Sequence, residues 1–173
     1  FDNDGYRDMI ITNGFPKDVT DRDFIDYWSS VEAYAPQSLL LSKIPSVKIS
    51  NYAYRNKGGI QFEDATDDWG IRMASFSNGA AYGDLDNDGD MDLIVNNIDE
   101  EAHIYRNNTT EITQNNFIKI KLKGSAKNVN GIGSNVMVQS GNQKQYKQHY
   151  VTRGYQSNVD YTMHFGLGQL DKV

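Results

Sequence analysis

The chain has 173 residues, of which 38% are hydrophobic and 23% are charged, and its net charge at neutral pH is -6. This length and composition allow one domain or two small ones with packed cores, and they exclude a chain that is disordered throughout. The acidic balance argues against a nucleic-acid partner, and the lack of cysteine excludes disulfides and thiolate metal sites. No run approaches the roughly 20 apolar residues of a transmembrane segment.

The chain begins with an acidic loop, "FDNDGYRDMIITN" (1–13), that turns apolar as a strand would. Residues 14–50 differ in character and are interpreted as an insertion. Within it, Phe24, Trp28 and Val31 recur at helical spacing. The pattern predicts a helix, capped by Asp18, Thr20 or Asp21, and "QSLLLSKI" between Pro36 and Pro45 predicts a second helical piece.

Three aromatic residues of the insertion are candidate ligand-binding residues: Tyr27, Trp28 and Tyr34. Exposed loops on a rigid scaffold often carry function, so these rings would suit a sugar or a protein partner. The alternative is that they pack the insertion against the rest of its domain. The sequence leaves both interpretations open.

The sequence pattern of residues 52–108 predicts β-structure throughout. "GGIQFEDAT" has the pattern of a hairpin, and "HIYRNN" predicts a short strand. Between them, "AAYGDL" leads into an acidic loop and "MDLIVNN" leaves it as a buried strand.

From residue 109 the pattern changes. "TTEITQNN" (109–116) is polar and predicts a linker. "FIKIKLK" alternates apolar residues with Lys119, Lys121 and Lys123, which predicts a half-buried strand with a lysine-rich outer face. A hairpin around residues 140–142 and a strand in "YTMHFGLG" follow. The predicted fold class is therefore all-β: partial propeller blades with a helical insertion in residues 1–108, then a small β-sandwich-like domain in residues 117–173.

Two motifs recur in register. Asp2, Asp4, Gly5 and Asp8 match residues 84 positions later, and "YRN" at 54–56 recurs 51 positions later, at 105–107. The two offsets agree if about 33 residues are inserted after the first loop. The sequence then contains one unit of about 51 residues, present twice, within the range of propeller blades.

The second acidic loop, "DLDNDGDMD", has the donor pattern of a calcium site. Asp84, Asp86 and Asp88 stand at loop positions 1, 3 and 5, the Asp90 carbonyl at position 7 and Asp92 at position 9. Two carboxylates about 4 Å apart repel by roughly 4 kcal/mol at an effective dielectric near 20, so a cation is expected between them. Calcium accepts such all-oxygen ligands, but an EF-hand would need a glutamate at position 12, where this loop has Val95.

The first loop offers the same donors through Asp2, Asp4, the Tyr6 carbonyl and Asp8. Its counterpart of Asp84 would precede Phe1, so occupancy of this loop is in doubt. The sequence is for this reason expected to be a piece of a longer protein.

These motifs carry a family resemblance. "DLDNDGDMDLIV" and "YRNKGGIQFEDAT" resemble FG-GAP/VCBS repeats, the calcium-loop blades of integrin-type β-propellers. The C-terminal stretch resembles the ASPIC/UnbV domain, trimmed at its end, in two segments: Gly124, Asn128, Gly131, Ile132 and Gly133, and the ending His164 to Gly168. The pairing resembles the cartilage acidic protein type and bacterial surface or secreted proteins, which implies an extracellular, cell-surface or outer-membrane-associated location.

The leading functional hypothesis is a non-catalytic, calcium-stabilised binding or adhesion module that presents a surface to a glycan or protein. The alternative is a fragment of a secreted or surface polysaccharide-processing enzyme whose catalytic residues lie outside this chain. A third possibility is a spacer that binds nothing but calcium. Because one blade and part of another cannot close a ring, an open sheet or pairing between chains along free strand edges is expected.

Overall fold

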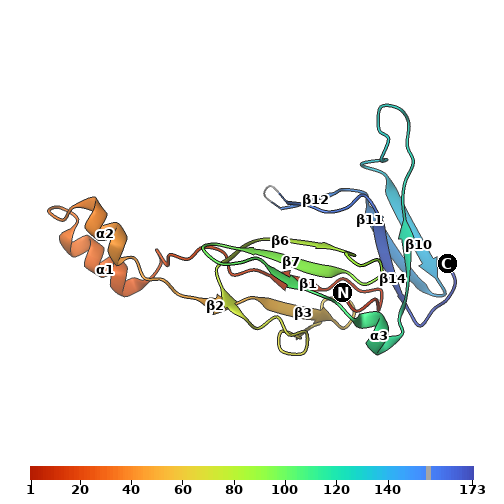
Figure 1. Cartoon of the computed structure of the whole chain (residues 1–173), viewed down its shortest axis with the longest axis horizontal. Coiled ribbons are helices and arrows are strands. Elements are labelled where there is room, and N and C mark those ends of the chain that lie inside the picture. The colour runs from red at the N-terminus through yellow and green to blue at the C-terminus, as the bar shows by residue number, and fades with distance from the viewer. Residues whose placement is uncertain (155–156) are drawn as a thin grey trace.

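The computed structural model describes residues 1–154 and 157–173 (Figure 1). Short antiparallel strands in small sheets dominate, so the predicted all-β class is confirmed. In the described part of the chain, none of the helices has both the length and the apolar character needed to cross a membrane.

The N-terminal part contains two similar three-stranded sheets and a two-stranded pair. Their strand orders are β1-β3-β4, β6-β7-β8 and β2-β5. The strands are β1 Met9–Ile11, β2 Ile49–Ser50, β3 Tyr52–Asn56, β4 Phe62–Asp64, β5 Ala74–Ser75, β6 Ser77–Gly83, β7 Asp92–Asn97 and β8 His103–Tyr105. Buried apolar residues from both sheets and from the 65–71 turn form one core, consisting of Ala53, Ile71, Leu93 and Val95.

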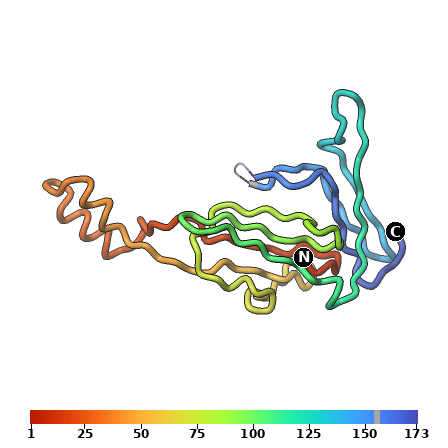
Figure 2. The backbone as a smooth tube through the Cα atoms, viewed as in Figure 1, coloured from red at the N-terminus to blue at the C-terminus, as the bar shows by residue number. Residues whose placement is uncertain are grey.

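The predicted helical insertion is present as two helices, α1 (Arg22–Val31) and α2 (Gln37–Lys43). Asp21 is the N-cap of α1, because its carboxylate accepts a hydrogen bond from the Phe24 backbone N–H at 2.7 Å. The hairpin projects away from the sheets at one end of the molecule (Figures 1 and 2). Its two connecting segments meet at an isolated bridge between Lys17 and Ser46.

The C-terminal part consists of strand pairs that share a second core. Strand β9 (Asn116–Ile120) pairs with β14 (Met163–Gly168), β10 (Asn135–Ser140) with β11 (Gln143–Gln148), and β12 (Thr152–Gly154) with β13 (Ser157–Asn158). Side chains alternate on β14, so Met163, Phe165 and Leu167 are buried and pack with Val138 of β10. This arrangement fits the expected small sandwich.

Residues 109–116, which the sequence predicts as a linker, contain a short helix, α3 (Thr109–Thr113). Thr109 is buried, and the Thr110 backbone N–H and hydroxyl both donate to the Asp90 carboxylate, at 2.7 and 3.0 Å. The segment that joins the two parts of the chain is therefore fixed to the second acidic loop.

Candidate metal centre

The two acidic loops have the same backbone conformation. Asn3 and Asn87 both adopt the left-handed region, with φ of 57° and 64°, and so do Gly5 and Gly89, with φ of 92° and 96°. In each loop two aspartates accept backbone hydrogen bonds from residues two positions ahead. Asp88 N–H donates to Asp86 and Asp4 N–H to Asp2, both at 3.3 Å. Asp90 N–H donates to Asp88 and Tyr6 N–H to Asp4, both at 2.8 Å. The predicted duplication of the loop is confirmed.

The strands around the loops repeat in the same way. Strand β1 pairs with β3 through Met9 and Tyr54, and β7 pairs with β8 through Leu93 and Tyr105, at the two offsets found in the sequence. An asparagine closes each unit. Asn107 N–H donates to Asp92 at 2.8 Å, and Asn56 N–H donates to Asp8 at 2.9 Å.

In the second loop, the structure brings three of the predicted metal ligands together. Carboxylate oxygens of Asp84, Asp86 and Asp88 all lie within 4.8 Å of one another. The Asp84 side chain is only 6% exposed, and its Oδ1 atom is buried without a hydrogen-bond partner, as is Oδ2 of Asp88. Buried polar atoms are nearly always partnered in proteins, so these two oxygens are candidates for contact with a positively charged ligand.

Two basic side chains already offset part of this charge. Lys119 of β9 pairs with Asp84, while Arg106 lies 2.9 Å from Asp86 and 3.6 Å from Asp88. The sequence predicts that a bound cation alone offsets the charge of these acids, but Lys119 and Arg106 also offset it. Lys119 also departs from its predicted role on a solvent-facing lysine surface, because it reaches into the loop.

The carboxyl pKa values reflect these contacts. Burial acts to raise the pKa of Asp86, but the hydrogen bonds from Asp88 N–H and from Arg106 outweigh it and lower that pKa below its ordinary value. Burial raises the pKa of Asp90. In the first loop, burial and the neighbouring Asp2 carboxylate raise the pKa of Asp4 to about 6. An extra positive charge beside Asp4 would therefore stabilise its ionised form.

Asp90 and Asp92 direct their carboxylates into the protein. Asp90 is fully buried and, besides Thr110, accepts a hydrogen bond from the Asn3 side chain at 2.9 Å. Asp92 accepts backbone hydrogen bonds from Leu85 and Asn107. The side chains of Asp90 and Asp92 thus hold the loop to its surroundings. Their assignment as ligands, by carbonyl and carboxylate respectively, stays a prediction.

The first loop is arranged less favourably for a metal. Asp2 lies 3.3 Å from Arg55, and Asp8 accepts a hydrogen bond from Asn56 N–H at 2.9 Å. Tyr6 is 48% exposed. Among the residues that the structure describes, carboxylates converge at metal-binding distances only in the second loop.

The long connection between β9 and β10 is shaped by the glycine-rich motif of the sequence. The Asn128 side chain both donates to the Ile132 carbonyl and accepts from the Ile132 N–H, each at 2.9 Å, and Gly124 N–H donates to the Val129 carbonyl.

Residues 124–173 match the ASPIC and UnbV family model. Comparisons with curated proteins and with solved structures gave no match. The likeness of the two loops to FG-GAP/VCBS repeats therefore rests on their motif and geometry.

The domain that carries the ASPIC/UnbV match lies directly against both acidic loops. The Phe117 ring of β9 covers Gly89 so closely that a Cβ at residue 89 would lie 1.9 Å from it, and the Gln143 side chain covers Gly5 in the same manner. His164 Nε2 lies 2.7 Å from the Asn3 side-chain oxygen. The loops are thus part of the interface between the two domains.

Sequence reasoning missed this interface. Gly5 and Gly89 both have positive φ, as the sharp loop turn requires, and their lack of a Cβ also permits close approach by the second domain. His164 stacks on Phe117, with ring centroids 5.3 Å apart, and burial lowers its pKa to about 3, so its imidazole is neutral at pH 7.

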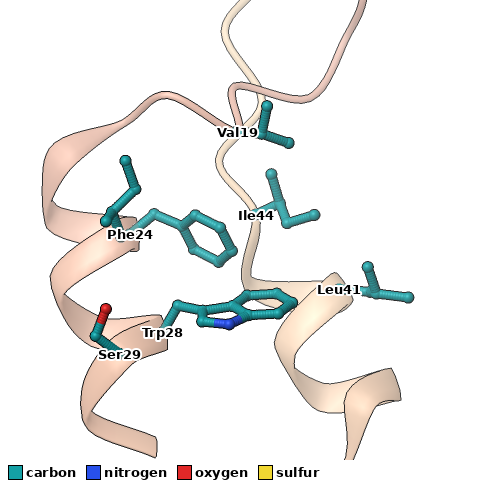
Figure 3. A pocket seen from close by; sticks show the side chains of 7 residues that line it. Val19, Phe24, Trp28, Ser29, Leu41 and Ile44 are labelled. Carbon is teal, nitrogen blue, oxygen red and sulfur yellow. The ribbon is translucent and has the colours of Figure 1, made fainter. Parts of the chain in front are cut away.

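The aromatic residues of the insertion lie far from this centre. Trp28 packs edge-on against Phe24, with centroids 5.6 Å apart, and lines a small apolar pocket between α1 and α2 (Figure 3). Tyr34 lies just beyond α1 and is 76% exposed, and its hydroxyl donates to the Ser30 carbonyl of that helix. Tyr27 is 38% exposed. Trp28 therefore stabilises the hairpin itself and does not attach it to the sheets, while Tyr27 and Tyr34 stay candidates for partner contacts.

Proposed function

We propose that this chain is a non-catalytic, calcium-stabilised binding module of an extracellular or cell-surface protein. The observation that carries the proposal is the convergence of Asp84, Asp86 and Asp88 around two buried carboxylate oxygens without hydrogen-bond partners. Calcium prefers carboxylate and carbonyl oxygens, and the loop offers these alone.

In this proposal, the second loop holds the ion through Asp84, Asp86, Asp88, the Asp90 carbonyl and Asp92. Each carboxylate oxygen has two lone pairs, so Asp92 can accept its two backbone hydrogen bonds and also face a cation. The first loop would use Asp2, Asp4, the Tyr6 carbonyl and Asp8. A bound calcium ion supplies the positive charge that lets these acids stay close together.

Lys119 and Arg106 set the affinity. Both pair with the acidic side chains of the loop, so a calcium ion must compete with them. This competition favours the modest affinity of extracellular modules, with dissociation constants of about 10⁻⁴–10⁻³ M. A site of this affinity is filled in calcium-rich surroundings, which supports the extracellular location.

A calcium ion in the second loop would also act on the domain interface. Phe117 covers Gly89 of the same loop, and Lys119, two residues further along β9, pairs with Asp84. A loop fixed by calcium presents a fixed surface to β9. The ion is therefore proposed to make the two domains a rigid scaffold for a glycan or protein ligand.

Calorimetric titration with calcium tests the metal site. The wild-type chain should bind with the stated affinity, and Asp86→Ala should lose binding to the second loop. Asp67→Ala is the matched control, because Asp67 is 73% exposed and, within the described part of the chain, forms an ion pair only with Arg72. No calcium uptake by the wild-type chain, or equal uptake by Asp86→Ala, would refute the site.

A glycan-array screen, run beside an assay for polysaccharide cleavage, tests the binding role. Stable binding without cleavage supports the proposal. Cleavage without stable binding would contradict it and favour an enzyme.

A further inference from the structure

A cleft of about 1060 Å³ lies between the two domains. One wall comes from the first acidic loop and from β6, and the other from β11, β14 and the segment that follows β13. Ligand pockets commonly measure about 300–1,000 Å³, so this cleft has room for several sugar rings. The second acidic loop also lines the cleft, through Asp84, Leu85, Asn87 and Met91.

Three basic residues line the cleft without acidic partners. In the described part of the chain, Arg7, Lys147 and Arg153 form no ion pair with a carboxylate, and their hydrogen bonds go to neutral groups. Arg7 donates to the Tyr146 carbonyl, Lys147 to the His164 carbonyl, and Arg153 to the Tyr82 hydroxyl at 2.7 Å.

Lys147 is the most confined of the three cations. Its ammonium group lies 4.8 Å from the centre of the Phe165 ring. Burial, together with the positive charges of Arg7 and Arg153, lowers its pKa to about 8. A bound anion would relieve this mutual repulsion and favour the charged ammonium.

The acidic residues of the cleft do not serve as partners for these cations. Asp8 accepts a hydrogen bond from Asn56 N–H, Asp160 accepts one from Tyr161 N–H, and Asp84 is paired with Lys119. Basic side chains outnumber acidic ones in the lining by four to three: Arg7, Lys119, Lys147 and Arg153 against Asp8, Asp84 and Asp160. The charge of the cleft lining is therefore positive, although the whole chain carries a net charge of -6.

Two buried imidazole nitrogens also lack partners. His149 is 3% exposed, and its Nε2 atom has no hydrogen-bond partner; the same holds for Nδ1 of His164. Both residues line the cleft. Sugar hydroxyls both donate and accept hydrogen bonds, so they match an imidazole nitrogen in either role.

Tyrosines complete the lining. Tyr6, Tyr146 and Tyr150 are 48%, 56% and 48% exposed, and all three border the cleft. An aromatic ring with a polar tip gives a ligand apolar contact area and a hydrogen bond at once. A sugar ring, with apolar C–H faces and polar edges, matches this surface.

We propose that the interdomain cleft binds an acidic oligosaccharide. Arg7, Lys147 and Arg153 contact its carboxylate or sulfate groups, the two histidines meet its hydroxyls, and the tyrosines contact its rings. The inference rests on the proposed binding function and names the ligand class. Guanidinium groups suit such oxyanions because they offer two parallel N–H donors.

The test is calorimetric titration of the full chain, in 5 mM calcium (on the order of several dissociation constants), with three oligosaccharides of equal length. One is an oligogalacturonate, one is sulfated and one is neutral. We expect an acidic oligomer to bind at least about tenfold more tightly than the neutral one, as charge-assisted hydrogen bonds allow, with binding weakened by salt. Preference for the carboxylated or the sulfated oligomer supports the proposal and identifies the anion.

Two variants localise the binding. Arg153→Gln removes an exposed cation, and Lys147→Met keeps the apolar stem over Phe165. Each should weaken binding by about tenfold. Arg72→Gln is the matched control, since Arg72 pairs with Asp67 outside the cleft, and it should bind as the wild type does. Melting curves establish that each variant is folded.

Equal affinity for the neutral oligomer, unchanged binding by Arg153→Gln, or no binding to the folded wild type would overturn the proposal. The calcium titration separates this result from a failure of the proposed metal site. Calcium uptake without saccharide binding would reject the cleft alone, whereas saccharide binding without calcium uptake would reject the metal site alone.

Discussion

Replacement of Asp84 by asparagine should abolish the stabilisation of this chain by calcium. Asp84 is the most buried of the three converging acids, and asparagine preserves its shape while removing its charge. For dissociation constants of about 10⁻⁴–10⁻³ M, 10 mM calcium (about 10 to 100 times those constants) stabilises the folded state by about 1.4–2.7 kcal/mol. In a chain of this size, that gain corresponds to a rise in Tm of about 3–11 °C.

Without calcium, the variant should melt within a few degrees of the wild type. Asparagine loses the ion pair with Lys119, but it also removes repulsion between Asp84 and Asp88, which is at least about 3.5 kcal/mol at an effective dielectric of 20 for oxygens within 4.8 Å of each other. These two effects oppose each other.

Differential scanning calorimetry with and without calcium measures both the rise in Tm on calcium addition and the Tm without calcium. Asp67→Asn is the control, and it should keep the full calcium response because Asp67 is exposed and distant in sequence from both loops. A wild-type Tm that does not change with calcium, or an Asp84→Asn variant whose Tm rises with calcium as much as that of the wild type, would refute the reasoning.

Three further predictions concern the interface, its pH dependence and the insertion. Gly89→Ala should lower the free energy of unfolding, measured in urea, by about 1–3 kcal/mol more than Gly70→Ala does. Both sites have positive φ, but only Gly89 is covered by a side chain, that of Phe117. Equal losses for the two variants would exclude the close approach of Phe117 to Gly89. The pKa of His164 is lowered from 6.5 to about 3, so unfolding binds a proton and stability falls as the pH drops through this window. His164→Gln should reduce the slope of the unfolding free energy against pH by up to about 1.4 kcal/mol per pH unit. An unchanged slope would contradict the lowered pKa of His164. Replacing residues 18–45 by Gly-Gly should leave the melting of the sheets within a few degrees of the wild type, since the hairpin projects away from them (Figure 1); loss of the cooperative transition would show that the hairpin supports the core.

Local structure was largely predictable from the sequence. The acidic repeats, the helical spacing of Phe24 and Trp28 and the alternation of residues 117–123 each depend on contacts between near neighbours in the chain. The structure confirms them as matched loops, helix α1 and strand β9, which packs Ile118 and Ile120 on the second core. The polar segment 109–116 was harder to predict, because the partner of Thr110 is Asp90, 20 residues earlier.

The sequence by itself determined that two equivalent acidic loops precede strands, because residue type and spacing fix turns, hydrogen-bonding side chains and the side-chain period. Only the tertiary structure decided what surrounds those loops. It placed Lys119 on Asp84, Phe117 on Gly89 and His164 beside Asn3. These contacts join residues far apart in the chain, and no local pattern encodes them, because they depend on how two separately formed cores meet.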